Sequence, residues 1–146
     1  MTNQYYVKAP RIGEVYMMNF TGSESEQCGF RPGLIIQNNT GNIYSPNIIA
    51  LPLTTSLKKT GQPTHVVVSA SDSGLKKDSM VLCENPECIS KCKLGKYVTT
   101  LSSGYMEEIA QAFILATSVI SFIDPMALIE LFNRASDLNS AYDAAE

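Results

Sequence analysis

The sequence predicts a small antiparallel β-barrel with helices at its C-terminal end, which is a mainly β fold of the α+β class. Over roughly the first hundred residues, short segments rich in β-branched and aromatic side chains recur between turn-forming residues, a pattern typical of small barrels. The apolar residues that follow change to the three- and four-residue spacing of an amphipathic helix. With 146 residues, the chain is long enough to build one domain around its own core.

The expected strands are bounded by residues that favour turns. The Asn-rich residues 38–42 are predicted to form a turn, because Asn and Gly tolerate a positive φ angle. Residues 71–78 are expected to form a loop or a single helical turn. Pro32 starts the second strand and restricts Arg31 to an extended conformation. Strands are expected at residues 14–20, 31–38, 47–53, 64–69, 80–83 and 96–101.

Two helices are predicted to follow the barrel. The first spans residues 106–123 and has Glu107 and Glu108 in its first turn, where the helix dipole favours acidic side chains. Asp124-Pro125 ends this helix and starts a second one over residues 126–145. Asp is a good N-cap, and Pro is tolerated at the first helical position.

Charge divides the chain into a near-neutral body and an acidic tail. Residues 1–123 hold ten Lys and Arg against nine Asp and Glu, a net charge of +1, whereas residues 124–146 hold one Arg against five acidic residues, a net charge of −4. We expect the first part to be a barrel domain with its C-terminal helix, and the second to be an additional acidic helix rather than a separate domain. Three clusters of lysines either lie in solvated loops or form a positive groove for a nucleic acid. They lie at residues 58–59, 76–77 and 91–96.

Two observations predict a cytoplasmic protein that does not enter a membrane. The N-terminal residues lack the charged segment and following apolar segment of a secretion signal. The longest weakly polar run, residues 109–123, is interrupted by polar side chains and is shorter than the roughly 18 residues that a membrane span needs.

The four cysteines and the single histidine argue against a metal centre. Cys83, Cys88 and Cys92 follow the spacing C-x4-C-x3-C, with Cys28 far away in the sequence, whereas structural zinc favours paired C-x2-C motifs. An intracellular chain of this size is not expected to depend on disulfides. We therefore expect free thiols, no metal and no other cofactor. His65 is expected to be a structural residue within a strand.

The stretch from residue 22 to residue 37 is the strongest candidate for a functional site. A loop of small and acidic residues, among them Glu24 and Glu26, leads directly into Arg31 at the root of a strand. The planar guanidinium of Arg31 matches phosphate oxygens and stays charged at physiological pH. The alternative is a surface ion pair between Arg31 and one of these two glutamates. Thr54 ends the third strand and, taken alone, is an ordinary strand-end threonine.

A set of short motifs extends along most of the chain. These motifs are Gly13-Glu14-Val15-Tyr16, Gly22-Ser23, Ser25-Glu26-Gln27, Arg31-Pro32-Gly33-Leu34-Ile35-Ile36-Gln37-Asn38, Ser45-Pro46, Leu53-Thr54-Thr55, Pro63-Thr64-His65-Val66, Lys77-Asp78-Ser79-Met80-Val81-Leu82, Glu84 and Leu101-Ser102. In this order they resemble the MazF/PemK family of toxin endoribonucleases from type II toxin–antitoxin systems. The resemblance covers about residues 11–123.

The resemblance implies a barrel related to SH3-like and CcdB-like folds, assembled as a homodimer. It implies metal-independent, sequence-specific cleavage of single-stranded RNA, chiefly mRNA, by attack of the ribose 2′-hydroxyl, with a 2′,3′-cyclic phosphate as product. It also implies a cognate antitoxin protein that inhibits the enzyme. Arg31, Thr54 and Glu26 match the catalytic positions of the family. The residues expected to bind substrate are Gln27, Thr55, Ser79, Glu84 and Asn85.

These residue types suit the cleavage of RNA. Arg31 can stabilise the negative charge that develops on the phosphate, a contribution often worth about 3 kcal/mol for each donor. Thr54 can donate a second hydrogen bond to the same phosphate. Glu26 is the remaining plausible base for the 2′-hydroxyl, because a single histidine excludes a two-histidine mechanism. The alternative for Glu26 is a solvated loop carboxylate.

The sequence departs from the family after the fifth expected strand. Many relatives read Glu-Gln-Ile-Arg there, whereas this chain shortens the glutamine to Asn85 and replaces the arginine with the acidic Glu87. Two alternative functions follow: a catalytically inactive relative that binds RNA or a protein, and a CcdB-like toxin directed at DNA gyrase. For residues 124–146 we expect a helix with its apolar side on the body or across the dimer, and with its acidic side mimicking RNA or antitoxin near the groove.

Overall fold

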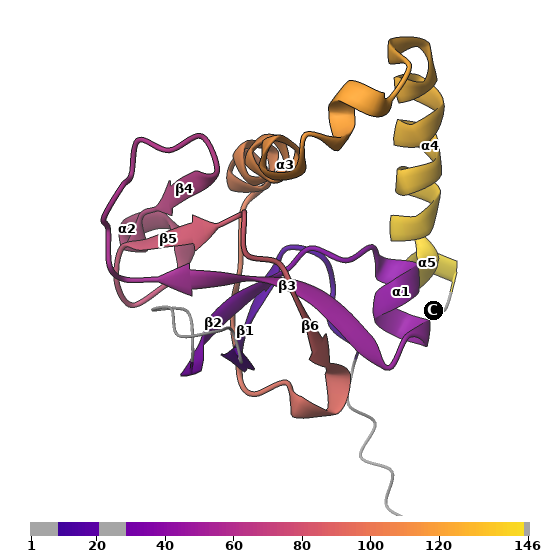
Figure 1. Cartoon of the computed structure of the whole chain (residues 1–146). Helices are drawn as coiled ribbons and strands as arrows, with labels where there is room; N and C mark the ends of the chain where they lie inside the picture. Colours follow the sequence, from indigo (N-terminus) through magenta and orange to yellow (C-terminus); the bar gives the residue numbers. More distant parts are fainter. Residues whose placement is uncertain (1–8, 21–28, 145–146) are drawn as a thin grey trace, which may run out of the picture.

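The computed structural model describes residues 9–20 and 29–144, which form a bent antiparallel sheet with helices above it and at both sides (Figure 1). The helix α3 lies above the sheet, and α4 stands beside α1. The strands are β1 (Glu14–Phe20), β2 (Gly29–Ile35), β3 (Asn47–Thr54), β4 (His65–Val68), β5 (Ser79–Leu82), β6 (Glu87–Ser90) and β7 (Tyr97–Thr100). The helices are α1 (Asn39–Tyr44), α2 (Ala70–Ser73), α3 (Ser103–Thr117), α4 (Leu128–Asn139) and α5 (Ala141–Ala144), with 3-10 turns η1 (Lys91–Lys93), η2 (Val119–Phe122) and η3 (Pro125–Ala127).

The strand β3 is shared between three partners. The sheet order is β4-β5-β3-β2-β1-β7, and β6 also pairs with β3. Residues 47–50 of β3 pair with β6, residues 50–52 pair with β2, and residues 53–54 pair with β5. All of these pairings are antiparallel. This arrangement confirms the predicted mainly β fold with C-terminal helices.

Two hydrophobic clusters lie on opposite faces of the sheet. Successive side chains of a strand point to opposite faces, so Leu34 and Leu51 enter the cluster that contacts α3, whereas Ile35 and Ala50 enter the other. From α3, Ile109 and Ala112 complete the first cluster. The second cluster consists of Met18, Phe20, Ile35, Ile48, Ala50 and Ile89.

Where a turn was predicted after the second strand, the chain forms the short helix α1. The strand β2 ends at Ile35, and the Asn38 side chain caps α1 by accepting a hydrogen bond from Gly41 N at 2.9 Å. The buried Asn42 donates from Nδ2 to Gln37 O at 2.9 Å. The prediction was wrong here because asparagine favours both turns and helix N-caps.

The helix α3 differs from its prediction at both ends. It begins at Ser103, capped by the Ser102 side chain, so Glu107 and Glu108 lie beyond its first turn, contrary to the prediction. It ends at Thr117 because the next residue adopts a positive φ angle of 56°. The strand β6 was also not predicted.

Residues 118–144 form a helical arm that docks back on α1. The predicted helix over residues 126–145 is instead divided into η3, α4 and α5. Asn139 accepts from Asn39 N at 3.2 Å through Oδ1 and from Asn39 Nδ2 at 3.1 Å through its carbonyl. Thr40 Oγ1 donates to Leu138 O at 2.8 Å. Arg11 stacks over the Tyr142 ring, 4.3 Å from its centroid.

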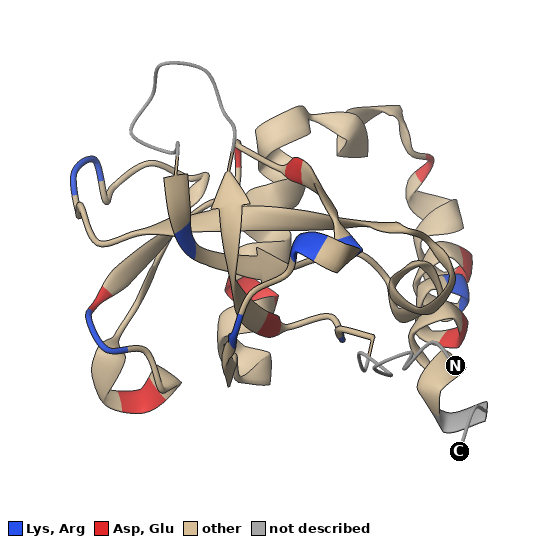
Figure 2. Cartoon of the chain, turned by 90° about the horizontal axis from the view of Figure 1, so that it is seen from below, with Lys and Arg blue, Asp and Glu red and all other residues tan. Residues whose placement is uncertain are grey.

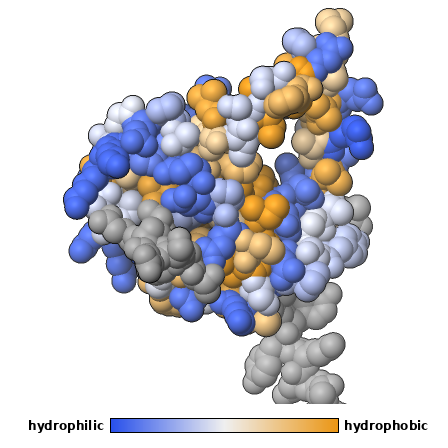
Figure 3. Space-filling model, in the orientation of Figure 1, coloured by the Kyte–Doolittle hydropathy of each residue, from blue (hydrophilic) through white to orange (hydrophobic). Residues whose placement is uncertain are grey.

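The helical arm carries large apolar side chains on its surface (Figure 3). Phe122 is 92% exposed and Phe132 is 73% exposed. None of the residues of α4 is buried. Within the described ranges, the helices are too short or too polar to traverse a bilayer.

We predict that deleting residues 118–146 leaves the sheet cooperatively folded. Neither hydrophobic cluster contains a residue of the arm, so the deletion removes mainly polar contacts at α1. Thermal unfolding should show a smaller decrease in Tm than Leu34→Ala, which should cost about 2–5 kcal/mol as a buried leucine. Loss of a cooperative transition in the shortened chain would contradict this prediction.

Candidate functional site

The pairing between β2 and β3 leads to Arg31 and Thr54. Gly33 pairs with Pro52, and the register continues inward to Ile35 and Ala50. Extending the same register outward by two residues would place Arg31 opposite Thr54. The pairing with β2 stops at Gly33 and Pro52, and Thr54 pairs with Met80 of β5 on the opposite edge of β3. Beyond this last pair, the side chains of Arg31 and Thr54 face a gap between the two strands.

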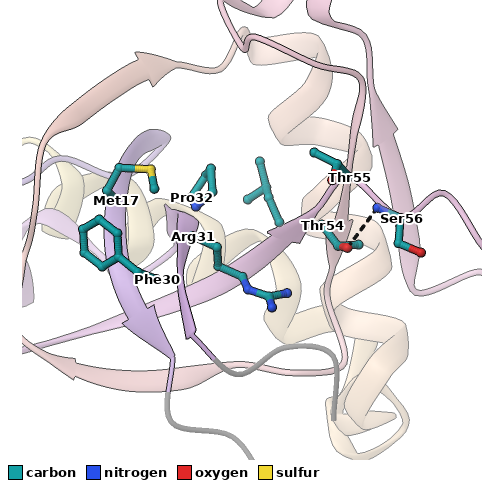
Figure 4. A pocket seen from close by; sticks show the side chains of 8 residues that line it. Met17, Phe30, Arg31, Pro32, Thr54, Thr55 and Ser56 are labelled. Carbon is teal, nitrogen blue, oxygen red and sulfur yellow. Dashed lines mark hydrogen bonds between the residues drawn. The ribbon is translucent and has the colours of Figure 1, made fainter.

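This gap is a pocket of about 400 Å³, which we call the Arg31–Thr54 pocket (Figure 4). Arg31 is half-buried, and its side chain extends from β2 toward the end of β3 that carries Thr54. Arg31 pairs with Met18 of the neighbouring strand β1, and this pairing fixes the backbone of Arg31. The pocket is lined by Met17, Phe30, Arg31, Pro32, Leu53, Thr54, Thr55 and Ser56.

The hydroxyl group of Thr54 is oriented by the backbone that follows it. Thr54 Oγ1 accepts a hydrogen bond from Ser56 N at 3.1 Å (Figure 4). Because the oxygen is used as an acceptor, the hydroxyl proton can be donated to a ligand in the pocket. Arg31 supplies a charged donor to the same space. Together they form a site suited to an oxyanion such as phosphate.

A second pocket of about 440 Å³ adjoins the first. The two pockets share Met17, Pro32 and Thr55. The second pocket also contains the buried Ser79, whose Oγ donates to Lys77 O at 2.9 Å. Of the predicted substrate-binding residues, Thr55 lines both pockets and Ser79 lines the second one.

Two other predicted substrate-binding residues, Glu84 and Asn85, line neither pocket. Glu84 Oε1 lies 2.6 Å from His65 Nε2, and the other ring nitrogen of His65 lies 2.9 Å from Lys59 O. His65 thereby ties the loop after β3 to the end of β5, a structural role as predicted. The backbone N of Asn85 donates to Leu82 O at 3.2 Å.

Glu26 and Gln27 lie outside the described residues. Five residues that line the Arg31–Thr54 pocket were not among the predicted site residues, namely Met17, Phe30, Pro32, Leu53 and Ser56. The pairing of Met17 with Pro32 could have revealed the first, but this pairing is known only once the register of β1 and β2 is known.

The cysteines outside residues 21–28 are all free thiols. Cys83 is buried, whereas Cys88 and Cys92 are exposed. Burial, assisted by the charge of Glu84, raises the pKa of Cys83 to about 12. In the described ranges, His, Cys, Asp and Glu do not gather in groups of three that could hold a metal ion.

Comparison with known proteins shows a family match that covers the whole sheet. The family described as the PemK-like, MazF-like toxin of type II toxin–antitoxin systems matches residues 11–117. The endoribonuclease MazF of Staphylococcus saprophyticus is 41% identical over 103 residues, which are 70% of this chain and 86% of that protein. The endoribonuclease MazF of Staphylococcus epidermidis is 37% identical over 113 residues, 77% of this chain and 94% of that protein.

A solved structure agrees with these sequence relationships. A mycobacterial endoribonuclease in complex with its cognate antitoxin is 31% identical, with a TM-score of 0.64 over 75% of this chain and 96% of that chain. The matched family region contains every strand of the sheet and α3. Fold and sequence together define a toxin of the type II toxin–antitoxin class. Within that class, the chain belongs to the PemK-like, MazF-like toxin family, which confirms the resemblance seen in the motifs.

We predict that Cys83 resists alkylation in the folded protein. The thiolate is the reactive species, and the high pKa of Cys83 keeps its thiol neutral at about pH 8. Iodoacetamide should modify Cys88 and Cys92 while sparing Cys83, and should reach Cys83 after denaturant is added. Peptide mass spectrometry measures this difference. Equal alkylation rates at Cys83 and Cys88 in the folded protein would show that the Cys83 thiol is accessible and reactive, contrary to the prediction.

We predict that Glu84 and His65 stabilise the fold as a pair. Substituting Glu84→Gln, His65→Gln and both together forms a double-mutant cycle measured by denaturant unfolding. Since the His65 side chain is 6% exposed and that of Glu84 is 34% exposed, a coupling free energy of about 1 kcal/mol is expected. Strictly additive effects would indicate that the contact contributes nothing to stability.

Proposed function

We propose that this chain is the endoribonuclease of a toxin–antitoxin pair and that it cleaves single-stranded RNA, chiefly mRNA, at short sequences. The curated relatives named endoribonuclease MazF support this class of activity. The observation that carries the proposal is the convergence of Arg31 and Thr54 on one pocket at the end of paired strands. A guanidinium and a hydroxyl fixed on strands present donors to a phosphate without further ordering.

In the proposed reaction, the nucleophile belongs to the substrate. The ribose 2′-oxygen forms a bond to the adjacent phosphorus and loses its proton, and the bond from phosphorus to the 5′-oxygen breaks. The 5′-oxygen takes up a proton, so the products are a 2′,3′-cyclic phosphate and a 5′-hydroxyl. This route does not require a metal ion, because the attacking group is already in place.

Each residue of the site has a proposed task. Arg31 donates to the phosphate oxygens as negative charge develops, and Thr54 donates a second hydrogen bond. Glu26 accepts the proton of the 2′-hydroxyl. Phe30, which is 64% exposed and borders the pocket, offers its ring to a base. The proposed substrate-binding set is Gln27, Thr55, Ser79, Glu84 and Asn85. Of these, Thr55 lines the Arg31–Thr54 pocket and Ser79 lines the second pocket.

We also propose a cognate antitoxin protein and a homodimer as the working assembly. The mycobacterial relative solved in complex with its cognate antitoxin supports the first partner. The cytoplasm is the proposed location, because mRNA is the proposed substrate.

We predict that Arg31→Ala lowers the rate of RNA cleavage in EDTA by about 10²–10³, the usual effect of removing one such donor. Arg31→Lys should recover part of this loss, since it keeps the charge but not the planar fork. Thr54→Val should lower the rate by about 10–10², because a neutral donor is weaker than a charged one. The measurement is single-turnover cleavage of a single-stranded RNA, with product ends identified by sequencing.

Arg134→Ala is the matched control, because Arg134 lies on α4 and lines neither pocket. Its cleavage rate should equal that of the wild type. Equal rates for Arg31→Ala and the wild type would remove Arg31 from the mechanism. Binding of RNA without any cleavage by the wild type would instead favour an inactive binding module.

A further inference from the structure

The second pocket contains a group of lysines that the proposed cleavage does not use. Lys76 and Lys77 come from the loop between α2 and β5, and Lys96 comes directly before β7. These segments are distant in sequence, and the sheet topology brings them to one cavity. Figure 2 shows basic residues at several loops and strand ends of the body. We call this cavity, lined by Lys76, Lys77, Lys96 and Tyr97 among others, the lysine pocket.

The charge of the lysine pocket is not neutralised from within. Among the described residues, none of its three ammonium groups has a hydrogen-bond or ion-pair partner. The nearest carboxylates in sequence are engaged elsewhere: Asp78 accepts from Ala70 N at 2.7 Å, and Asp72 accepts from Tyr105 Oη at 2.6 Å. Three ammonium groups around one cavity create a positive potential that attracts a polyanion.

The pocket also presents an aromatic ring in a fixed orientation. Tyr97 is 47% exposed, and its hydroxyl lies 2.7 Å from Thr100 Oγ1. The Tyr97 ring meets Tyr16 edge to face, with centroids 5.7 Å apart and an interplanar angle of 75°. A ring held on both sides can receive a base by stacking at a small entropic cost.

Ser79 supports the loop that carries the lysines. Its hydroxyl donates to Lys77 O at 2.9 Å, and the group is buried. Its proton is therefore committed to the loop, and we assign Ser79 a positioning role for Lys77. This refines the substrate-binding role that the sequence predicted for Ser79.

We propose that the lysine pocket binds the nucleotide unit next to the cleaved link of single-stranded RNA, a proposal that depends on the proposed function. The flanking phosphate contacts Lys76, Lys77 and Lys96, and the base stacks on Tyr97. The two pockets share Met17, Pro32 and Thr55, so one continuous strand can occupy both. The lysines hold the strand in register and take no part in breaking the bond.

The test uses the full chain and an RNA whose cleavage site has been mapped with the wild-type protein. Replacing the reacting 2′-hydroxyl with hydrogen removes the nucleophile, so binding can be measured without cleavage. The pocket variant is the double substitution Lys77→Gln and Lys96→Gln. The control is Lys93→Gln with Arg134→Gln, which removes the same charge from exposed residues outside both pockets.

Fluorescence anisotropy should show at least a tenfold weaker affinity for the pocket variant than for the control. The slope of log affinity against log salt should fall by about 0.7, because each neutralised phosphate on a single strand contributes about 0.7. Tyr97→Ala should weaken binding with an unchanged slope, and Tyr97→Phe should bind like the wild type. The same affinity and slope for the pocket variant and the control would overturn the proposal.

Shortening the RNA provides a second readout. Removing nucleotides on one side of the cleaved link should abolish the difference between the pocket variant and the control. Persistence of the difference after shortening on either side would overturn the proposal. Failure of the wild type to cleave the all-ribose RNA would refute the proposed function, whereas cleavage with equal behaviour of the two variants would refute only the lysine pocket.

Discussion

The successive pairing of β3 with three strands is the constraint on which the site depends. Residues 50–52 pair with β2 on one edge, and residues 53–54 pair with β5 on the other edge. The pairing of β2 with β3 ends at Gly33 and Pro52, and the Arg31–Thr54 pocket lies beyond that pair. The opening is thus a property of the sheet and not of a mobile loop. Donors fixed in this way lose little entropy when a phosphate enters.

The fold could be predicted where the pattern was local and strong. Runs such as residues 47–54 are apolar and bounded by polar residues, so β3 was recognised almost to its ends. The strand β6 was missed because only Ile89 of its four residues is buried. The stop at Ser118 was missed because its positive φ angle is not typical of serine. Such positions are decided by packing that a single sequence does not display.

The site was predictable in part of its membership but not in its geometry. The resemblance pointed to Arg31 and Thr54, yet their apposition follows from a register between two strands that lie far apart in sequence. The partner of Glu84 is His65, 19 residues away, and no local pattern indicates that contact. The lysines were visible as clusters, and only the topology places Lys96 with Lys76 and Lys77. These contacts join residues that are distant in sequence, so they could be identified only from the structure.

Because side chains alternate along β3, the same strand register decides which residues enter the core and which face the pocket. Leu51 and Leu53 fill the cluster under α3, and Thr54 takes the opposite face. Inserting or deleting one residue within this strand would turn the threonine inward and expose leucines at the same time. Residues around the two cavities can therefore be substituted one at a time, whereas the length of β3 cannot change by one residue without disturbing the core and the pocket together.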